Sequence, residues 1–167
     1  MSMFSRMLKK VLPPPEIVEQ ERFLFIGPHP DDIEIGAGAT AARLAAMGKA
    51  VKFLICTDGR YGTEDPDMDV QKLIKIRQEE ARAAAASLGV SDVEFLPYPD
   101  GGGYERADLM NSIVKVICEF RPDIIFAPDS RLRTETHLDH LNVGEAASNA
   151  FIISGCANMM AERGLTS

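Results

Sequence analysis

Histidines and aspartates of this sequence gather in two short clusters, His-Pro-Asp-Asp at residues 29–32 and His-Leu-Asp-His at residues 137–140. The chain has three histidines, and all of them belong to these clusters. Imidazole nitrogens and carboxylate oxygens are ligands that zinc takes in catalytic sites, where three protein ligands leave one position open. If the fold joins the clusters, they can hold one divalent metal and still leave a carboxylate and an imidazole for acid–base chemistry.

The candidate metal ligands are His29, Asp32 and His140. His29 and Asp32 lie three residues apart where a strand is expected to turn into a helix, and His140 lies near the start of a later helix. Asp31 and His137 then remain free to act on a bound substrate. The alternative interpretation is that each histidine is only a helix cap or a loop residue, but it has to account separately for every histidine of the chain.

Apolar runs and helix-forming segments alternate along the sequence. Strands are expected at residues 23–27, 51–56, 93–96 and 123–127, and helices at residues 33–47, 70–88, 109–120 and 141–160. Strands buried on both faces read as continuous apolar runs, and their alternation with helices is typical of a parallel sheet. The sequence therefore predicts an α/β, Rossmann-like three-layer fold with a mainly parallel sheet and helices on both faces.

This topology has a consequence for the polar residues that follow each strand. In open parallel sheets, ligands bind beyond the carboxyl ends of the strands, near the point where the strand order reverses. The first cluster follows the first strand, and the second cluster follows the fourth. Asp58 comes directly after the second strand and Asp100 after the third. All four loops are therefore expected to place polar side chains on one edge of the sheet.

Size, composition and charge narrow the class of protein. A chain of 167 residues with 46% hydrophobic content fits one globular domain. The net charge of −7 argues against nucleic-acid binding, which needs a basic face. No apolar run is long enough to cross a membrane. Cys56, Cys118 and Cys156 have no metal-type spacing and lie in apolar segments, which predicts buried, reduced thiols in a cytoplasmic protein.

The first residues form a separate segment. Residues 1–12 carry three basic side chains among apolar ones, and the prolines at positions 13–15 follow. This pattern predicts a short amphipathic surface helix or an oligomer contact, because a signal peptide would place its charges ahead of an uninterrupted apolar core. We therefore expect residues 1–20 to form a helix with a proline-rich lead-in, and residues 21–167 to form the domain.

The two clusters resemble the motifs of a known family, the PIG-L/LmbE zinc-dependent N-deacetylases, which remove acetyl groups from N-acetylglucosamine-containing substrates. Residues 29–32 are similar to the family's opening motif. Residues 137–140 are similar to its second motif, His-Pro-Asp-His, with Leu138 in place of the proline. Further similarities, from Phe23 to Phe151, are Thr57-Asp58-Gly59, Arg77 with Glu80, and Leu88-Gly89. Residues 33–38 and 57–67 are most similar to the archaeal diacetylchitobiose and N-acetylglucosamine deacetylases.

The resemblance implies a role for each member of the clusters. His29, Asp32 and His140 would bind Zn²⁺, although two histidines and one aspartate also suit other divalent transition metals. Asp31 would be the general base, and His137 would stabilise the oxyanion that forms at the acetyl group. The substrate would be a small N-acetylated amino sugar such as N-acetylglucosamine or diacetylchitobiose, or another N-acetylglucosamine conjugate.

Three further residues receive roles from the same resemblance. Asp139 would orient His137. Arg77 and Asp100 match family positions that contact the sugar, whereas spacing alone leaves Arg77 equally well explained as a solvated helix charge. Asp58 is a candidate for fixing its own loop, since Asp-Gly is a frequent turn pair.

Two other classes of protein compete with a deacetylase. A nucleotide-binding oxidoreductase or transferase would need a glycine fingerprint, but Gly36 and Gly38 lack the third glycine and sit inside a helix. The second alternative is a silent or partial Rossmann-like module. Family members are usually longer and often form homo-oligomers, so the pocket of a chain shortened at its C-terminus would be completed by further segments or a neighbouring subunit.

Residues 101–103 are all glycine, which indicates loop mobility or a close backbone approach.

Overall fold

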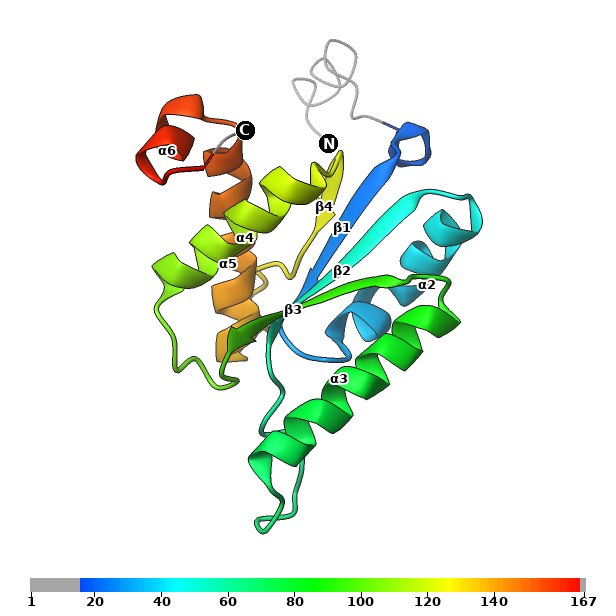
Figure 1. The fold of residues 1–167 in the computed structure, drawn as a ribbon, viewed down its shortest axis with the longest axis vertical. Helices are drawn as coiled ribbons and strands as arrows, with labels where there is room; N and C mark the ends of the chain where they lie inside the picture. The colour runs from blue at the N-terminus through cyan, green and yellow to red at the C-terminus, as the bar shows by residue number, and fades with distance from the viewer. Residues whose placement is uncertain (1–15, 166–167) are drawn as a thin grey trace.

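The computed structural model describes residues 16–165 and contains a four-stranded parallel sheet in the order β3-β2-β1-β4 (Figure 1). The strands are β1 (Arg22–Gly27), β2 (Ala50–Thr57), β3 (Asp92–Tyr98) and β4 (Ile124–Phe126). The helices are α2 (Asp32–Ala46), α3 (Val70–Ser87), α4 (Arg106–Phe120), α5 (Leu138–Ser154) and α6 (Ala157–Glu162), preceded by the 3₁₀ helix η1 (Ile17–Glu19). The predicted α/β fold is confirmed. The helix expected at residues 1–12 lies outside the described residues.

Every strand pairing is parallel, and β1 pairs with both β2 and β4. The chain proceeds from β1 through β2 to β3 on one side, and β4 then joins on the other side of β1. The order therefore reverses at β1. Crevices for ligands form beyond the carboxyl ends of strands at such a reversal, and here those strands are β1 and β4.

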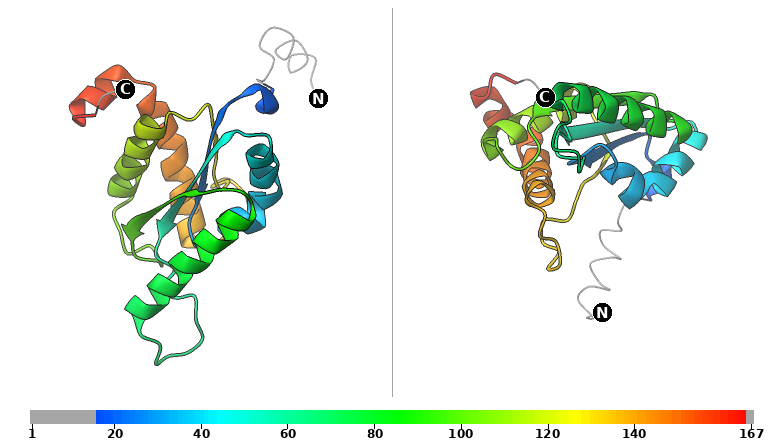
Figure 2. Two further views of the ribbon diagram at one scale, coloured as in Figure 1. Left: turned by 45° about the vertical axis from the view of Figure 1, so that its right-hand side comes forward. Right: turned by 90° about the horizontal axis from the view of Figure 1, so that it is seen from below.

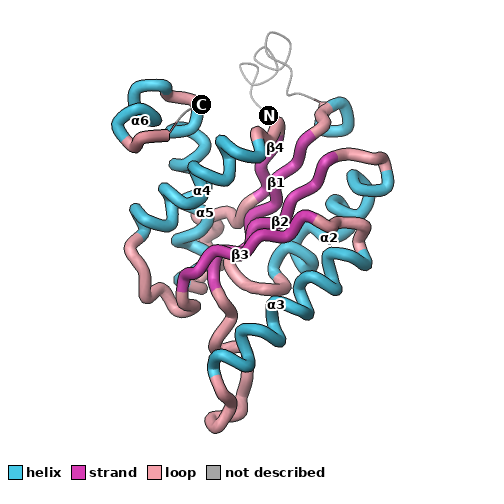
Figure 3. The backbone as a smooth tube through the Cα atoms, in the orientation of Figure 1, coloured by secondary structure: helices cyan, strands magenta, loops and turns pink. Residues whose placement is uncertain are grey.

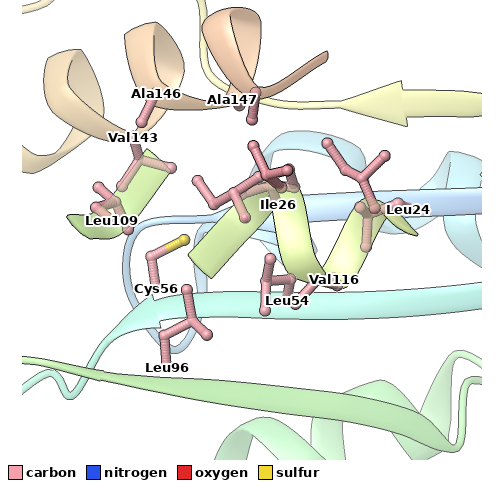
Figure 4. Packing of buried hydrophobic residues seen from close by; sticks show 14 of the residues in the cluster. Leu24, Ile26, Leu54, Cys56, Leu96, Leu109, Val116, Val143, Ala146 and Ala147 are labelled. Carbon is pink, nitrogen blue, oxygen red and sulfur yellow. The ribbon is translucent and has the colours of Figure 1, made fainter. Parts of the chain in front are cut away.

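Alternating residues of the strands face two separate hydrophobic cores. Leu24 and Ile26 of β1 pack with residues of α4 and α5 in one core (Figure 4), to which α6 contributes Met160. Phe23 and Phe25 pack with residues of α2 and α3 in the other. Because successive side chains of a strand point to opposite faces, helices cover the sheet on both sides. The two layers hold the strand ends in fixed positions.

The loops at the carboxyl ends of the strands lie at one end of the molecule. Those that follow β2 and β3 extend beyond the same end of the sheet (Figure 3), and the first turn of α5 lies at that end too (Figures 1 and 2). The loop after β1 is a tight turn in which the backbone N–H of Asp31 bonds to the carbonyl of His29 at 2.9 Å. The fold thus gathers the polar loops as the sequence predicts.

Some predicted bounds differ from the structure, and one predicted helix is divided. The helices α4 and α5 begin at Arg106 and Leu138, each three residues earlier than expected, and β3 extends to Tyr98. The helix expected at residues 141–160 consists of α5 and α6, with a break at Gly155 and Cys156. Glycine is a poor helix former, and the break lets α6 turn back so that Met160 is buried in the core with the half-buried Cys118. A straight helix would have carried Met160 away from that core.

Cys56 is fully buried as predicted, whereas Cys118 and Cys156 are only partly buried. All three thiols are free. Within residues 16–165, no helix has both the length and the apolar character that a membrane span requires.

Candidate functional site

The structure brings the two clusters together at the ends of β1 and β4. Asp32 begins α2 directly after the turn, and His137 caps the N-terminus of α5. The ring centroids of His29 and His137 are 4.7 Å apart, those of His137 and His140 4.8 Å, and those of His29 and His140 5.4 Å. Imidazoles that are far apart in the sequence therefore share one site.

Asp32 lies between two of the imidazoles. Its Oδ2 atom is 3.0 Å from Nδ1 of His29, and its Oδ1 atom is 3.3 Å from Nε2 of His140. The backbone N–H of His29 also donates to Oδ2 of Asp32, at 2.8 Å. The carboxylate of Asp32 thus faces one ring nitrogen of His29 and one of His140.

The other nitrogen of each histidine contacts a further carboxylate. Nε2 of His29 lies 3.2 Å from Oδ1 of Asp100 and 3.4 Å from Oδ2 of Asp139. Nδ1 of His140 lies 2.8 Å from Oε2 of Glu135. Metal-binding histidines characteristically bond through their second nitrogen to a carboxylate or carbonyl, which fixes the ring orientation and its tautomer. The contacts of His29 and His140 fit that pattern.

Carboxylates around His29 make this position favourable for a cation. Burial by itself would lower the pKa of His29, but its hydrogen bonds to Asp100 and Asp32 outweigh burial and raise the pKa to about 10. The same bonds hold the pKa of Asp32 and of Asp100 below the usual range, against the opposing effect of burial. A site with this charge attracts either a proton or a metal ion.

Two triplets of side chains in residues 16–165 bring potential metal-binding atoms within 4.8 Å of one another. One is formed by His29, His137 and His140, and the other by His29, Asp100 and Asp139. The set expected from the sequence, His29, Asp32 and His140, is neither of these triplets. Its members are in contact through Asp32, because one carboxylate oxygen lies near His29 and the other near His140. Of these histidines, only His137 is exposed.

Glu135 is a residue that the sequence reasoning missed. Besides His140, it accepts hydrogen bonds from the backbone N–H groups of Thr136 and His137, at 2.8 and 2.7 Å. These bonds hold its pKa below the usual range. Its position two residues before the second cluster was the available signal, because a carboxylate in that loop can reach back to the first turn of the helix.

Arg77 contacts Asp31 and the turn that carries it. The Nη2 atom of Arg77 lies 2.7 Å from Oδ2 of Asp31 and 2.7 Å from the carbonyl oxygen of Pro30. Its Nη1 atom donates to Glu80 at 2.9 Å. The arginine that the sequence assigns to the sugar thus binds the carboxylate that the sequence assigns as the base, and half of that carboxylate side chain is exposed.

Asp139 has other partners than the one expected. It is fully buried and accepts hydrogen bonds from the Gly101 N–H at 2.8 Å and from the Tyr104 hydroxyl at 2.6 Å. Its remaining contact is with His29, and no hydrogen bond to His137 is present among the described residues. Burial and the neighbouring Asp139 carboxylate raise the pKa of Tyr104. Asp139 therefore supports the loop after β3, and Tyr104 is a second residue that the sequence reasoning missed.

Asp58 fixes its loop, as the sequence suggested. It pairs with Arg60 at 2.6 Å, and its Oδ1 atom accepts a bond from the backbone N–H of Asp100 at 3.2 Å. The loop after β2 therefore holds the loop after β3, and with it the carboxylate that contacts His29.

Known proteins are similar to this chain in sequence. The family described as PIG-L, GlcNAc-PI de-N-acetylase, matches residues 24–151. A diacetylchitobiose deacetylase from Thermococcus kodakarensis is 36% identical and is aligned over 83% of this chain and 52% of its own length. A 1D-myo-inositol 2-acetamido-2-deoxy-alpha-D-glucopyranoside deacetylase from Kineococcus radiotolerans is 31% identical, over 81% of this chain and 46% of its own.

A solved structure is similar as well. The N,N'-diacetylchitobiose deacetylase from Pyrococcus horikoshii superimposes with a TM-score of 0.87 at 33% identity, covering 95% of this chain and 61% of that one. The chain spans about half the length of the curated relatives it matches.

Proposed function

Because the chain belongs to the PIG-L family of de-N-acetylases, we propose that it hydrolyses the acetamido group of an N-acetylated amino sugar, with a divalent metal ion held by His29, Asp32 and His140. The substrate class follows from the relatives. Their names specify diacetylchitobiose and an inositol-linked 2-acetamido-2-deoxyglucose. Both compounds carry an acetamido group on carbon 2 of a glucose ring.

The observation that carries the proposal is the position of Asp32 between His29 and His140. In each of these rings, the nitrogen that faces away from Asp32 already contacts another carboxylate. Asp32 contacts His29 and His140 at 3.0 and 3.3 Å, and carboxylates contact the far side of both rings. The ring of His137 has no such carboxylate partner among the described residues. This difference supports two imidazoles as ligands and the third as a group free to meet the substrate.

A divalent ion at this position supplies a Lewis acid for the acetyl carbonyl and, in zinc enzymes, lowers the pKa of water to about 7. We propose Zn²⁺, although the same ligands also suit other divalent transition metals. Three protein ligands are the usual number in catalytic zinc sites.

The remaining cluster residues carry the proton chemistry. Asp31 would accept a proton from the water whose oxygen attacks the acetyl carbon. His137 would donate a hydrogen bond to the carbonyl oxygen as negative charge develops there, a contribution worth about 10²–10³ in rate at comparable sites. The proton held by Asp31 would pass to the amide nitrogen as the carbon–nitrogen bond breaks. Acetate and a free amino sugar result.

Metal content and acetate release test the proposal together. Purified protein should contain about one divalent metal per chain and release acetate from N-acetylglucosamine or diacetylchitobiose. Asp31→Asn should keep the metal and lose turnover, whereas His140→Ala should lose both. Asp129→Asn, which removes an exposed carboxylate of the loop before α5, should change neither. Protein that binds metal but releases no acetate from any of these amides would favour the silent module instead.

A further inference from the structure

Tyr61 is an aromatic side chain that the proposed chemistry does not use. It lies in the loop between β2 and α3, and 69% of it is exposed. The ring centroids of the other tyrosines, Tyr98 and Tyr104, lie 5.3 Å apart with their planes tilted by 56°, and both rings pack against the core. A single exposed aromatic residue is common on protein surfaces, so its surroundings decide whether it has a role.

The ring of Tyr61 lies across the glycine loop beside the candidate site. A Cβ atom at Gly101 would lie 3.1 Å from Cε2 of Tyr61, and the φ angle of Gly101 is +92°. The next residue, Gly102, accommodates Leu138 in the same way, since a Cβ there would lie 2.5 Å from Cδ2 of that leucine. Because glycines have no side chains, two exposed apolar groups can approach this loop closely. They are Tyr61, from the loop after β2, and Leu138, from α5.

The backbone that carries Tyr61 is held firmly although its ring is exposed. Arg60 is paired with Asp58, and the N–H of Gly62 bonds to the carbonyl of Gly59 at 3.0 Å. The backbone N–H of Tyr61 faces the carboxylate of Asp100 and contributes to its lowered pKa. The backbone from which the ring extends is thus held in place, and such preorganisation lowers the entropic cost of binding.

Successive contacts connect three chemically different groups at this place. His29 comes first, then Asp100, whose carboxylate contacts His29 at 3.2 Å, and then Tyr61, whose ring edge rests on the residue after Asp100. An acetamido sugar reacting beside His29 would bring its hydroxyl groups to Asp100. The ring joined to that sugar would then reach Tyr61. Apolar faces of ring compounds pack on aromatic side chains, while a few polar groups set their orientation.

We propose that Tyr61 is a binding platform for the second ring of the substrate, meaning the sugar or cyclitol bonded to the N-acetylated sugar. The inference rests on the proposed function for the identity of the first ring. Leu138, which is 52% exposed, lies against the neighbouring glycine, Gly102. Tyr61 then determines preference for two-ring over one-ring substrates and takes no part in the reaction itself.

Kinetics with substrates of two lengths test this role. Tyr61→Ala should lower kcat/KM for diacetylchitobiose about three- to tenfold through KM, and for N-acetylglucosamine less than about twofold. Tyr61→Phe should stay close to the wild type, because the ring and not the hydroxyl makes the contact. Phe151→Ala, which removes an exposed aromatic residue near the far end of α5, is the matched control. Equal losses on both substrates, or no loss, would show the platform to be wrong.

The glycine loop offers a second pair of variants. Gly101→Ala should lower kcat/KM for diacetylchitobiose as Tyr61→Ala does, since its Cβ would displace the ring, and the φ of +92° adds backbone strain. Gly48→Ala is the control for strain alone, because its φ is +78° and a Cβ there meets nothing within 4 Å. A loss in Gly101→Ala that is equal for both substrates would contradict displacement of the ring as its cause.

Binding without turnover separates this proposal from the proposed function. Calorimetric titration of Asp31→Asn protein with diacetylchitobiose should give a Kd that rises about three- to tenfold when Tyr61→Ala is added. If Kd rises in this way while the wild type releases no acetate, the role of Tyr61 is supported and the proposed function is contradicted. If the wild type releases acetate but neither KM nor Kd depends on Tyr61, only the role of Tyr61 is contradicted. Absence of both binding and activity counts against both.

Discussion

The Nη2 atom of Arg77 lies 2.7 Å from Oδ2 of Asp31 and the same distance from the carbonyl oxygen of Pro30. A single guanidinium group of α3 thus holds both the side chain and the backbone of the turn after β1. Glu80, one turn further along α3, binds the other terminal nitrogen. The position of Asp31, the candidate base, therefore depends on α3, a helix that comes after α2 and β2 in the chain.

Arg77→Met should lower kcat about 10²-fold, because an error of about 1 Å in the position of a reacting group has that effect. Metal content should stay unchanged, and Arg77→Lys should restore part of the rate. The measurement is acetate release together with metal analysis. Arg82→Met is the control on the same helix, where the guanidinium lies over the ring of Phe95. If only KM rose in Arg77→Met, Arg77 would be a sugar contact instead.

Glu135→Gln should weaken metal binding about 10- to 100-fold, the usual cost of removing a carboxylate behind a histidine ligand. The reason is the 2.8 Å contact between Glu135 and Nδ1 of His140, which fixes that imidazole. Competition with a coloured chelator measures the affinity. Asp129→Asn in the same loop serves as the control, and an equal effect in both variants would contradict a specific role for Glu135.

Tyr104→Phe should lower the free energy of unfolding by about 1.5–3 kcal/mol, the range for hydrogen bonds to charged groups. Its hydroxyl donates to Asp139, which is fully buried. Tyr98→Phe is the matched control, because that hydroxyl bonds only to the neutral Ser112 at 2.7 Å. Its expected cost is about 0.5–1.5 kcal/mol. Urea denaturation of both variants would reveal the difference, and equal costs would contradict it.

Asp58→Asn should destabilise the protein in a pH-dependent way. Burial opposes ionisation of Asp58, but its bonds from Arg60 and the Asp100 N–H prevail and hold its pKa below the usual range. The carboxylate therefore stabilises the fold above about pH 4, its unfolded pKa, and this contribution is lost as the pH falls through the lower folded pKa.

The difference in unfolding free energy between wild type and Asp58→Asn should be about 1–2 kcal/mol at pH 7 and should shrink towards pH 3. Denaturation curves at several pH values measure it. Asp65→Asn, in an exposed part of the same loop, should show no such trend. A constant difference across the pH range would mean that the charge of Asp58 is not the cause.

Much of the fold follows from local pattern. The apolar run at residues 23–27 and the helix with its glycine stop at residues 33–47 lie within a residue of their observed bounds. The differences lie at the starts of α4 and α5, three residues earlier than expected, and at Gly155. There a poor helix former and the burial of Met160 prevailed over a continuous helical pattern. Such a break depends on the space available in the core, which local sequence does not describe.

The sequence by itself determined which side chains share the site, because strands of a parallel sheet deliver their carboxyl ends to one edge whatever the details of packing. This rule predicts that His29, Asp32 and His140 meet at one edge, whereas their proposed role as metal ligands comes from the family resemblance. Only the tertiary structure decided their partners: Glu135 behind His140, Tyr104 on Asp139, and Arg77 on Asp31. Hydrogen bonds depend on distances of a few tenths of an ångström, and these are set by how helices and loops pack, not by their order along the chain.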